Sequence, residues 1–74
     1  MSEPFMDITR IGNLVRIERQ RRGLTQATLA QMANVSKGRV EAIENGRCLD
    51  MGLNTVNSVL LALGFSLSVG LTPA

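Results

Sequence analysis

Apolar positions along this chain of 74 residues follow two different periods. Up to residue 63 they recur every three or four positions, which is the period of an amphipathic α-helix. This spacing predicts one helix from residue 8 to about 22, two at about 26–33 and 37–44, and a fourth that ends at residue 63. From Phe65 to Leu71 every second residue is apolar, as in a half-buried β-strand. We therefore expect an all-α bundle of about four helices followed by one strand.

Residues that favour helix ends flank each predicted helix. Side chains that can accept a hydrogen bond from a free backbone N–H precede the four helices, namely Asp7, Thr25, Ser36 and either Asn54 or Thr55. Residues that tolerate a positive φ angle follow them, namely Gly23, Asn34, Gly46 and Gly64. The second and third helices are thus predicted to be separated by a tight turn at Asn34.

One face of each predicted helix is apolar and should form the core. The expected core residues are Ile8, Ile11 and Val15, with Leu14 and Ile17 beside them, then Leu29, Ala30, Ala33, Val40 and Ile43, and finally Leu53, Val56, Leu60 and Leu63. A chain of this length buries only about 60% of its unfolded surface, so its stability alone is marginal. A single cysteine and the lack of histidine exclude an internal disulfide and a cysteine–histidine zinc site. Oligomerisation is therefore expected to supply the additional stability that the fold needs.

The predicted strand has no second strand to pair with in this sequence. Its backbone N–H and C=O groups therefore need a partner, and the symmetric solution is the same strand of a second copy. This predicts a dimer interface formed by Phe65, Leu67, Val69 and Leu71. The alternative is an extended tail that lies on its own core. The expected organisation is a flexible segment 1–7, a helical domain 8–64 and a C-terminal dimerisation segment 65–74.

The charges are unevenly distributed along the chain. Residues 8–47 contain all eight basic residues and three acidic ones, a balance of +5, whereas residues 1–7 carry −2 and residues 48–74 carry −1. This division indicates that the basic part meets a polyanion and the nearly uncharged part meets protein. A solvated basic face without a partner is the alternative. We see no signal peptide, and no apolar run reaches the roughly 20 residues of a membrane span.

Residues 25–46 combine these features into one unit. The two short helices, the turn at Asn34, the small Ala30 and the apolar pair Val40 and Ile43 have the spacing of a helix-turn-helix, whose second helix enters the DNA major groove. The text from Gly23-Leu24-Thr25-Gln26 to Ile43-Glu44-Asn45-Gly46 resembles the Xre/Cro family of lambda-repressor-like DNA-binding domains, and the resemblance covers residues 8–64. The ending, from Asn54-Thr55-Val56 through Gly64 into the alternating segment, resembles HipB-type antitoxins, in which a C-terminal strand pairs across the dimer.

The first turn of the third helix carries the candidate base-reading residues. Arg39 is expected to bind the O6 and N7 atoms of a guanine, and Lys37 to do the same or to hold a phosphate. Gly38 either permits a close approach of the backbone or is merely tolerated near a helix start. Glu41 either pairs with Lys37, one turn away, or accepts a hydrogen bond from the N4 amine of a cytosine.

Further candidate residues surround this turn. The resembled family uses the glutamine at Gln26 for the DNA backbone, beside the N–H groups of a helix N-terminus; a surface glutamine without a role is the alternative. A phosphate clamp is predicted in the loop after the third helix, at Asn45, Gly46 and Arg47. The other predicted DNA-binding residues are Thr25 and Ser36, which precede the second and third helices. Three further arginines fit an exposed helix face as well as distant phosphate contacts, namely Arg16, Arg21 and Arg22.

Two other assignments do not involve DNA. The resembled family buries an arginine–glutamate pair that joins the first helix to the third, which implies a structural ion pair between Arg19 and Glu44. Cys48 is expected to be a passive packed thiol, with thiol sensing as the alternative.

These observations predict a DNA-binding transcriptional repressor that acts as a homodimer on an inverted-repeat operator of double-stranded DNA. The alternative is an antitoxin that neutralises a toxin protein and regulates its own operon. Without histidine, tyrosine or a metal-ligand cluster the chain is not expected to be an enzyme, and neither a cofactor nor a metal is expected. The expected location is the cytoplasm, for a protein of bacterial or phage origin, in association with the nucleoid and not with a membrane.

Overall fold

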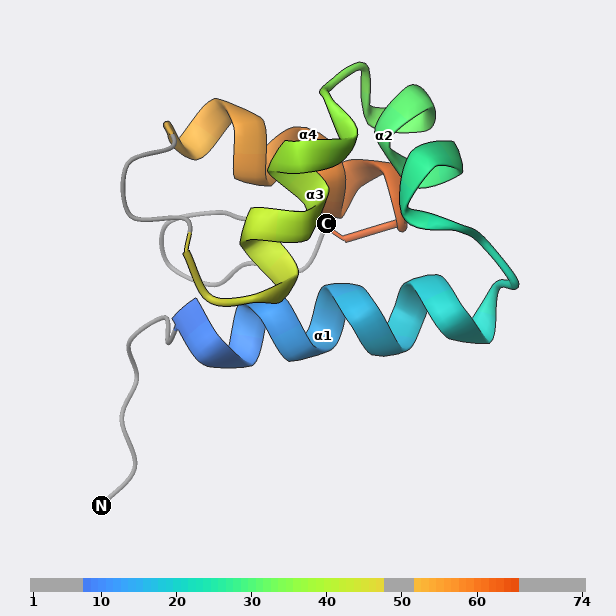
Figure 1. Cartoon of the computed structure of the whole chain (residues 1–74), viewed down its shortest axis with the longest axis horizontal. Coiled ribbons are helices and arrows are strands. Elements are labelled where there is room, and N and C mark those ends of the chain that lie inside the picture. The colour runs from blue at the N-terminus through green and yellow to red at the C-terminus, as the bar shows by residue number, and fades with distance from the viewer. Residues whose placement is uncertain (1–7, 48–51, 66–74) are drawn as a thin grey trace.

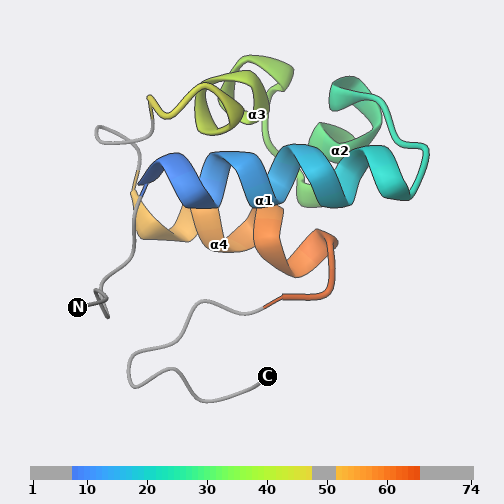
Figure 2. The ribbon, with the colours of Figure 1, turned by 90° about the horizontal axis from the view of Figure 1, so that it is seen from below.

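The computed structural model describes residues 8–47 and 52–65, which form four helices and no strand within those ranges. The helices are α1 (Ile8–Arg21), α2 (Gln26–Ala33), α3 (Lys37–Glu44) and α4 (Leu53–Ala62). Figure 1 shows α1 along one side of the molecule, with the other three helices above it. In the view from below, α3 and α4 lie on opposite sides of α1 (Figure 2). The central element is α3, which contacts all three other helices. The predicted helical bundle is confirmed for the described residues.

All four described helices end in the same way. A residue with a positive φ angle follows each of them, namely Gly23 (68°), Asn34 (59°), Gly46 (74°) and Gly64 (91°). Backbone N–H groups at and after these residues turn back to the last free carbonyls of the helix. After α4, for example, Gly64 donates to Leu61 O at 2.9 Å and Phe65 donates to Leu60 O at 2.8 Å. The predicted stop positions are therefore confirmed.

The helix starts agree with the predictions in two cases and differ in one. Thr25 accepts a hydrogen bond from the Thr28 N–H at 3.0 Å, and Ser36 accepts one from the Arg39 N–H at 3.2 Å, so both are N-caps. The predicted cap of α4 at Asn54 or Thr55 is wrong, because the helix starts at Leu53 after Gly52, which makes no side-chain cap bond. The Gly52 carbonyl already accepts the Thr55 N–H at 3.1 Å, so that Asn54 and Thr55 lie inside the first turn. Asp7, the predicted cap of α1, lies outside the described residues.

The core is formed by one face of each helix. Its fully or almost fully buried apolar residues are Val15, Leu29, Ala30, Ala33, Val40, Ile43, Val56, Val59, Leu60 and Leu63, with Ile11 and Leu14 packed against them. Ile17 is 53% exposed, contrary to its predicted place beside this face. It follows the buried Val15 by two positions, and two positions on a helix differ by roughly 200° in direction. The side chain of Ile8 lies outside the described residues.

The predicted apolar stripe of α4 also needs a correction. Leu53 is 66% exposed, whereas Val59, which was not part of the predicted stripe, is fully buried. Leu53 has nearly the same angular position as the buried Leu60, but it is the first residue of α4. It therefore lies about 10 Å away along the axis, beyond the part of the helix that the core covers.

The chain leaves α4 through Phe65, which is partly buried and packs against the core of its own chain. Phe65 was expected to open the C-terminal strand and the dimer interface, but it is not in a strand, because its N–H closes the end of α4. The remaining predicted interface residues, Leu67, Val69 and Leu71, lie outside the described residues. Among the helices that the structure describes, none combines the length and apolar character that a membrane span requires.

Candidate nucleic-acid interface

The segment from α2 to α3 forms two helices held at a fixed angle. Asn34 adopts the left-handed conformation, with φ 59° and ψ 44°, and the Val35 N–H donates to Ala30 O at 3.0 Å. Both helices contribute buried residues to one core, so their mutual orientation is set by packing as well as by the turn. The predicted boundaries of both helices are confirmed.

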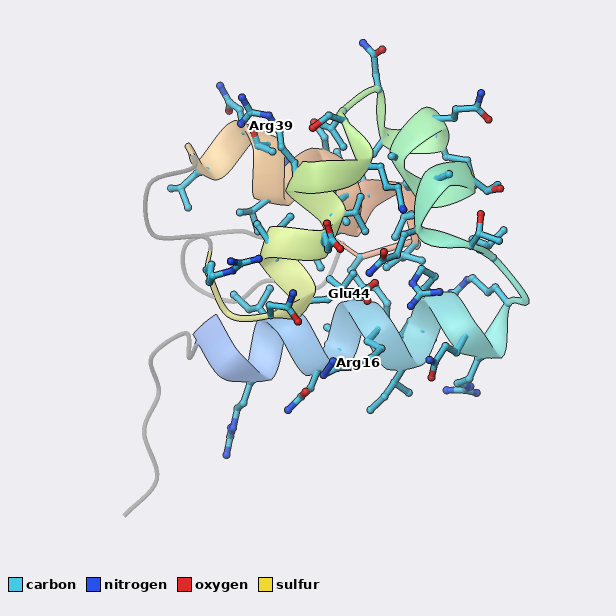
Figure 3. The ribbon with its side chains drawn as sticks, viewed as in Figure 1. Arg16, Arg39 and Glu44 are labelled. Atoms are coloured by element: carbon cyan, nitrogen blue, oxygen red, sulfur yellow. The ribbon has the colours of Figure 1, made fainter. Side chains whose placement is uncertain are left out.

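The two ends of α3 lie in different surroundings. Its inner end carries the buried Glu44, which lies between α3 and α1 (Figure 3). Its outer end carries Arg39, which points away from α1. The same surface also exposes Lys37, Gly38 and Glu41. Within the described residues, no ion pair is formed by the charged side chains of Lys37, Arg39 and Glu41. The pairing of Glu41 with Lys37, one of the two predicted alternatives, is therefore not observed.

At the inner end, Arg19 and Glu44 form a bidentate ion pair. Arg19 Nε donates to Glu44 Oε2 at 2.7 Å and Arg19 Nη2 donates to Glu44 Oε1 at 3.1 Å. The third donor, Arg19 Nη1, binds the Leu24 carbonyl at 2.9 Å in the connection to α2. Burial alone would raise the pKa of Glu44, but the hydrogen bonds from Arg19 and Gln26, together with the positive charges of Arg19 and Arg16, lower this pKa. The pair joins α1 to α3 with the carboxylate charged.

Gln26 takes part in the same cluster. Its Nε2 atom donates to Glu44 Oε1 at 3.1 Å, so the side chain is directed towards the inner end of α3. It is partly buried, whereas the neighbouring N-cap Thr25 is exposed and its hydroxyl donates to the Thr28 hydroxyl at 2.9 Å. Gln26 thus joins the start of α2 to the ion pair, a contact that sequence reasoning did not find.

A glycine in the middle of α1 also brings the helices together. Gly12 is buried, and a Cβ atom added there would overlap the carbonyl oxygen of Ile43 and lie 3.0 Å from that of Glu44. One turn later, Arg16 Nη1 reaches the Glu44 carbonyl at 3.5 Å and Arg16 Nη2 donates to Asn13 at 2.7 Å. A cation is favourable at a helix C-terminus, such as this end of α3. An isolated glycine inside an apolar helix pattern was the available sequence signal for this contact.

Arg21, the last residue of α1, and Arg22, which follows it, bind groups of their own chain. Arg21 and Arg22 both donate to Glu18, at 3.1 Å and 2.6 Å, and Arg22 also donates to the Leu63 carbonyl at 2.8 Å. The hydrogen bond from Arg22 is the main cause that lowers the pKa of Glu18. Both arginines are exposed, in agreement with the predicted exposed helix face, and the other alternative, distant phosphate contacts, stays a prediction.

The loop after α3 leaves its polar groups accessible. Asn45 and Arg47 are exposed, and the Arg47 N–H donates to Ala42 O at 2.8 Å, which fixes the backbone after Gly46. Arg47 makes no ion pair within the described part of the chain. Cys48 lies outside the described residues. Among the residues that are described, no group of histidine, cysteine, aspartate and glutamate side chains is arranged to hold a metal.

Comparison with known families decides what this arrangement is. Residues 10–68 match the helix-turn-helix domain, so the match extends over most of the chain. The chain belongs to the helix-turn-helix domain family. Membership in this family implies DNA binding. A search among curated proteins finds no match to this helix-turn-helix protein.

Proposed function

We propose that this protein is a transcriptional regulator that reads double-stranded DNA with α3 and acts as a repressor. The observation that carries this proposal is the outer end of α3. There, Lys37 and Arg39 are exposed and free of ion pairs among the described residues, while the opposite face of the helix is buried. Arg39 is assigned to guanine in the major groove, because the guanidinium group matches the O6 and N7 acceptors of that base.

The phosphate contacts are proposed to surround this base-reading turn. Arg47 and Asn45 are exposed after α3, and the exposed Thr25 opens α2. Helix starts provide free N–H groups for a phosphate, and Thr25 and Ser36 lie at two of them. For Gln26, the backbone N–H at the helix start is the better candidate, because the side-chain amide is engaged with Glu44.

We further propose that the protein acts as a homodimer on an inverted repeat. One recognition helix covers half of a symmetric operator, and half-site centres are separated by about 34–36 Å or a multiple of that distance. The alternating segment from Phe65 to Leu71 supports a dimer contact near the C-terminus. The same segment favours a second candidate function, that of an antitoxin which also binds a toxin protein, through its resemblance to HipB-type endings.

A footprint on the DNA upstream of the protein's own gene tests the main proposal. We expect protection of a site with two-fold symmetry, and light scattering should give the mass of a dimer. Protein that protects no site and binds all duplexes equally would contradict sequence-specific regulation. Co-purification with the product of the adjacent reading frame would support the antitoxin function in addition.

A further inference from the structure

Glu41 is an acidic residue on a surface that otherwise offers positive charge. It lies in the second turn of α3 and is exposed. Lys37 lies one turn before it, at the spacing that allows an ion pair, but no such pair forms, and no other described cation approaches its carboxylate. The other two acids of the described residues, Glu18 and Glu44, are both paired with arginines. The side chain of Glu41 is therefore not held by an ion pair within the described fold.

A carboxylate at this place has few acceptable partners on DNA. It can only accept hydrogen bonds, and phosphate oxygens, guanine O6 and N7 and thymine O4 are acceptors as well. The donors that the major groove displays are the exocyclic amines, and for a carboxylate the matching one is N4 of cytosine. Facing any acceptor, the charge of Glu41 would stay desolvated and unpaired.

The direction of Glu41 differs from that of Arg39. Residues two positions apart on a helix differ by roughly 200° in direction, so the side chains of Arg39 and Glu41 lie on either side of the outward face of α3. Gly38 and Ala42 lie between them on this face and are small. Arg39 and Glu41 can thus meet different base pairs when α3 lies in the groove.

We propose that Glu41 is a specificity-determining residue that accepts a hydrogen bond from the N4 amine of a cytosine and weakens binding wherever that amine is absent. This inference rests on the proposed sequence-specific DNA binding. Arg39 can bind favourably to many DNA sequences, whereas the carboxylate of Glu41 weakens binding to sequences that lack the cytosine amine. Discrimination by a penalty of this kind is a general way to gain specificity without gaining affinity.

The test is selection of bound duplexes from a random library, by the wild type and by the variants Glu41→Ala and Glu41→Gln. Glu18→Gln is the matched control, because it removes one negative charge from α1 and leaves α3 unchanged. For the wild type we expect one cytosine in each half-site to be preferred by about tenfold, within the range of one good base contact. Glu41→Ala should lose this preference and bind random duplex more tightly. Glu41→Gln should shift the same position towards adenine, whose N6 and N7 atoms suit an amide.

The outcomes separate this inference from the proposed function. A wild-type motif that Glu41→Ala leaves unchanged overturns the role of Glu41 alone. Loss of the preference in Glu18→Gln as well would overturn it too, because net charge rather than a contact would then be the cause. If the wild type enriches no motif at all, the proposed function fails and this inference fails with it.

Discussion

Charged side chains gather at both the inner and the outer end of α3, but in opposite states. At the inner end, Glu44, Arg19 and Arg16 are bound to one another or to backbone carbonyls, and Glu44 is only 5% exposed. At the outer end, Lys37, Arg39 and Glu41 are exposed and form no ion pair within the described chain. The difference arises from the neighbours, because α1 covers the inner end and nothing described covers the outer one (Figure 3). A single helix thus uses its charges for the fold at one end and keeps them available at the other.

The two helical glycines repeat this contrast. Gly12 is required by the fold, since any side chain there meets the backbone of α3. A Cβ atom added at Gly38 would meet only the Ser36 hydroxyl, at 3.9 Å. The fold therefore does not require a glycine at position 38, which directs attention to what α3 binds.

Loss of the buried ion pair should have the largest effect. In Glu44→Ala, Arg19 and Gln26 lose their shared acceptor, and we expect the free energy of unfolding to fall by about 3 kcal/mol, as for other broken buried pairs. Urea denaturation followed by circular dichroism measures this. Glu18→Ala is the control, because its pairs with Arg21 and Arg22 are at the surface and should matter much less. Equal losses in both variants would contradict the contrast between the two ends.

Gly12→Ala should be the next most damaging change. The added methyl group must push α1 away from α3, and we expect a loss of about 2 kcal/mol, which is typical of overpacking at a rigid contact. Thermal unfolding detects this as a lower Tm. A Tm equal to that of the wild type would show that the two helices can separate without cost.

Arg39→Ala should leave stability unchanged and act on DNA alone. We expect the discrimination between the operator and a duplex altered at one base pair to fall by roughly 1–3 kcal/mol. Fluorescence anisotropy titrations with both duplexes measure it. Arg21→Ala removes the same charge from an exposed part of α1 and should retain the discrimination. If Arg39→Ala weakened both duplexes equally, Arg39 would be a phosphate contact.

The pH dependence of the free energy of unfolding should show whether Glu44 is charged in the folded protein. Its pKa is lowered in the folded protein, so the contribution of the charged form is present above its ordinary value of 4.5 and is lost as the pH falls through the lower, folded value. The wild type should therefore be more stable than Glu44→Gln at pH 7, and the difference should shrink below pH 4.5. Denaturation curves of both proteins across this range provide the comparison, and a difference that is independent of pH would contradict a charged pair.

Gly38→Ala should give the smallest change in stability, and in the opposite direction. Alanine is the better helix former, by up to about 1 kcal/mol, and the structure leaves room for its methyl group. We expect unchanged or slightly raised stability together with weaker operator binding, because the methyl group would keep the α3 backbone away from the bases. Unaltered affinity in the anisotropy assay would instead mean that glycine is merely tolerated there.

Local chemistry explains the features that the sequence alone determined. The bounds of α2 and α3 follow from the hydroxyls of Thr25 and Ser36 and from the left-handed turn at Asn34, all of which act within a few residues. The exposed candidates Lys37, Gly38, Arg39 and Glu41 could likewise be placed by counting from Ser36. The Arg19–Glu44 contact came from the family resemblance and not from spacing.

Only the tertiary structure decided the rest. It placed Gly12 and Arg16 against the end of α3, turned Gln26 towards Glu44, left Glu41 without Lys37, and started α4 at Leu53. Most of these outcomes depend on which segments meet across 18 to 28 residues of chain, as in the contacts of Gln26 and Arg16 with Glu44. A helical period tells which residues share a face, but the packing of α1 on α3 determines which end of that face is covered.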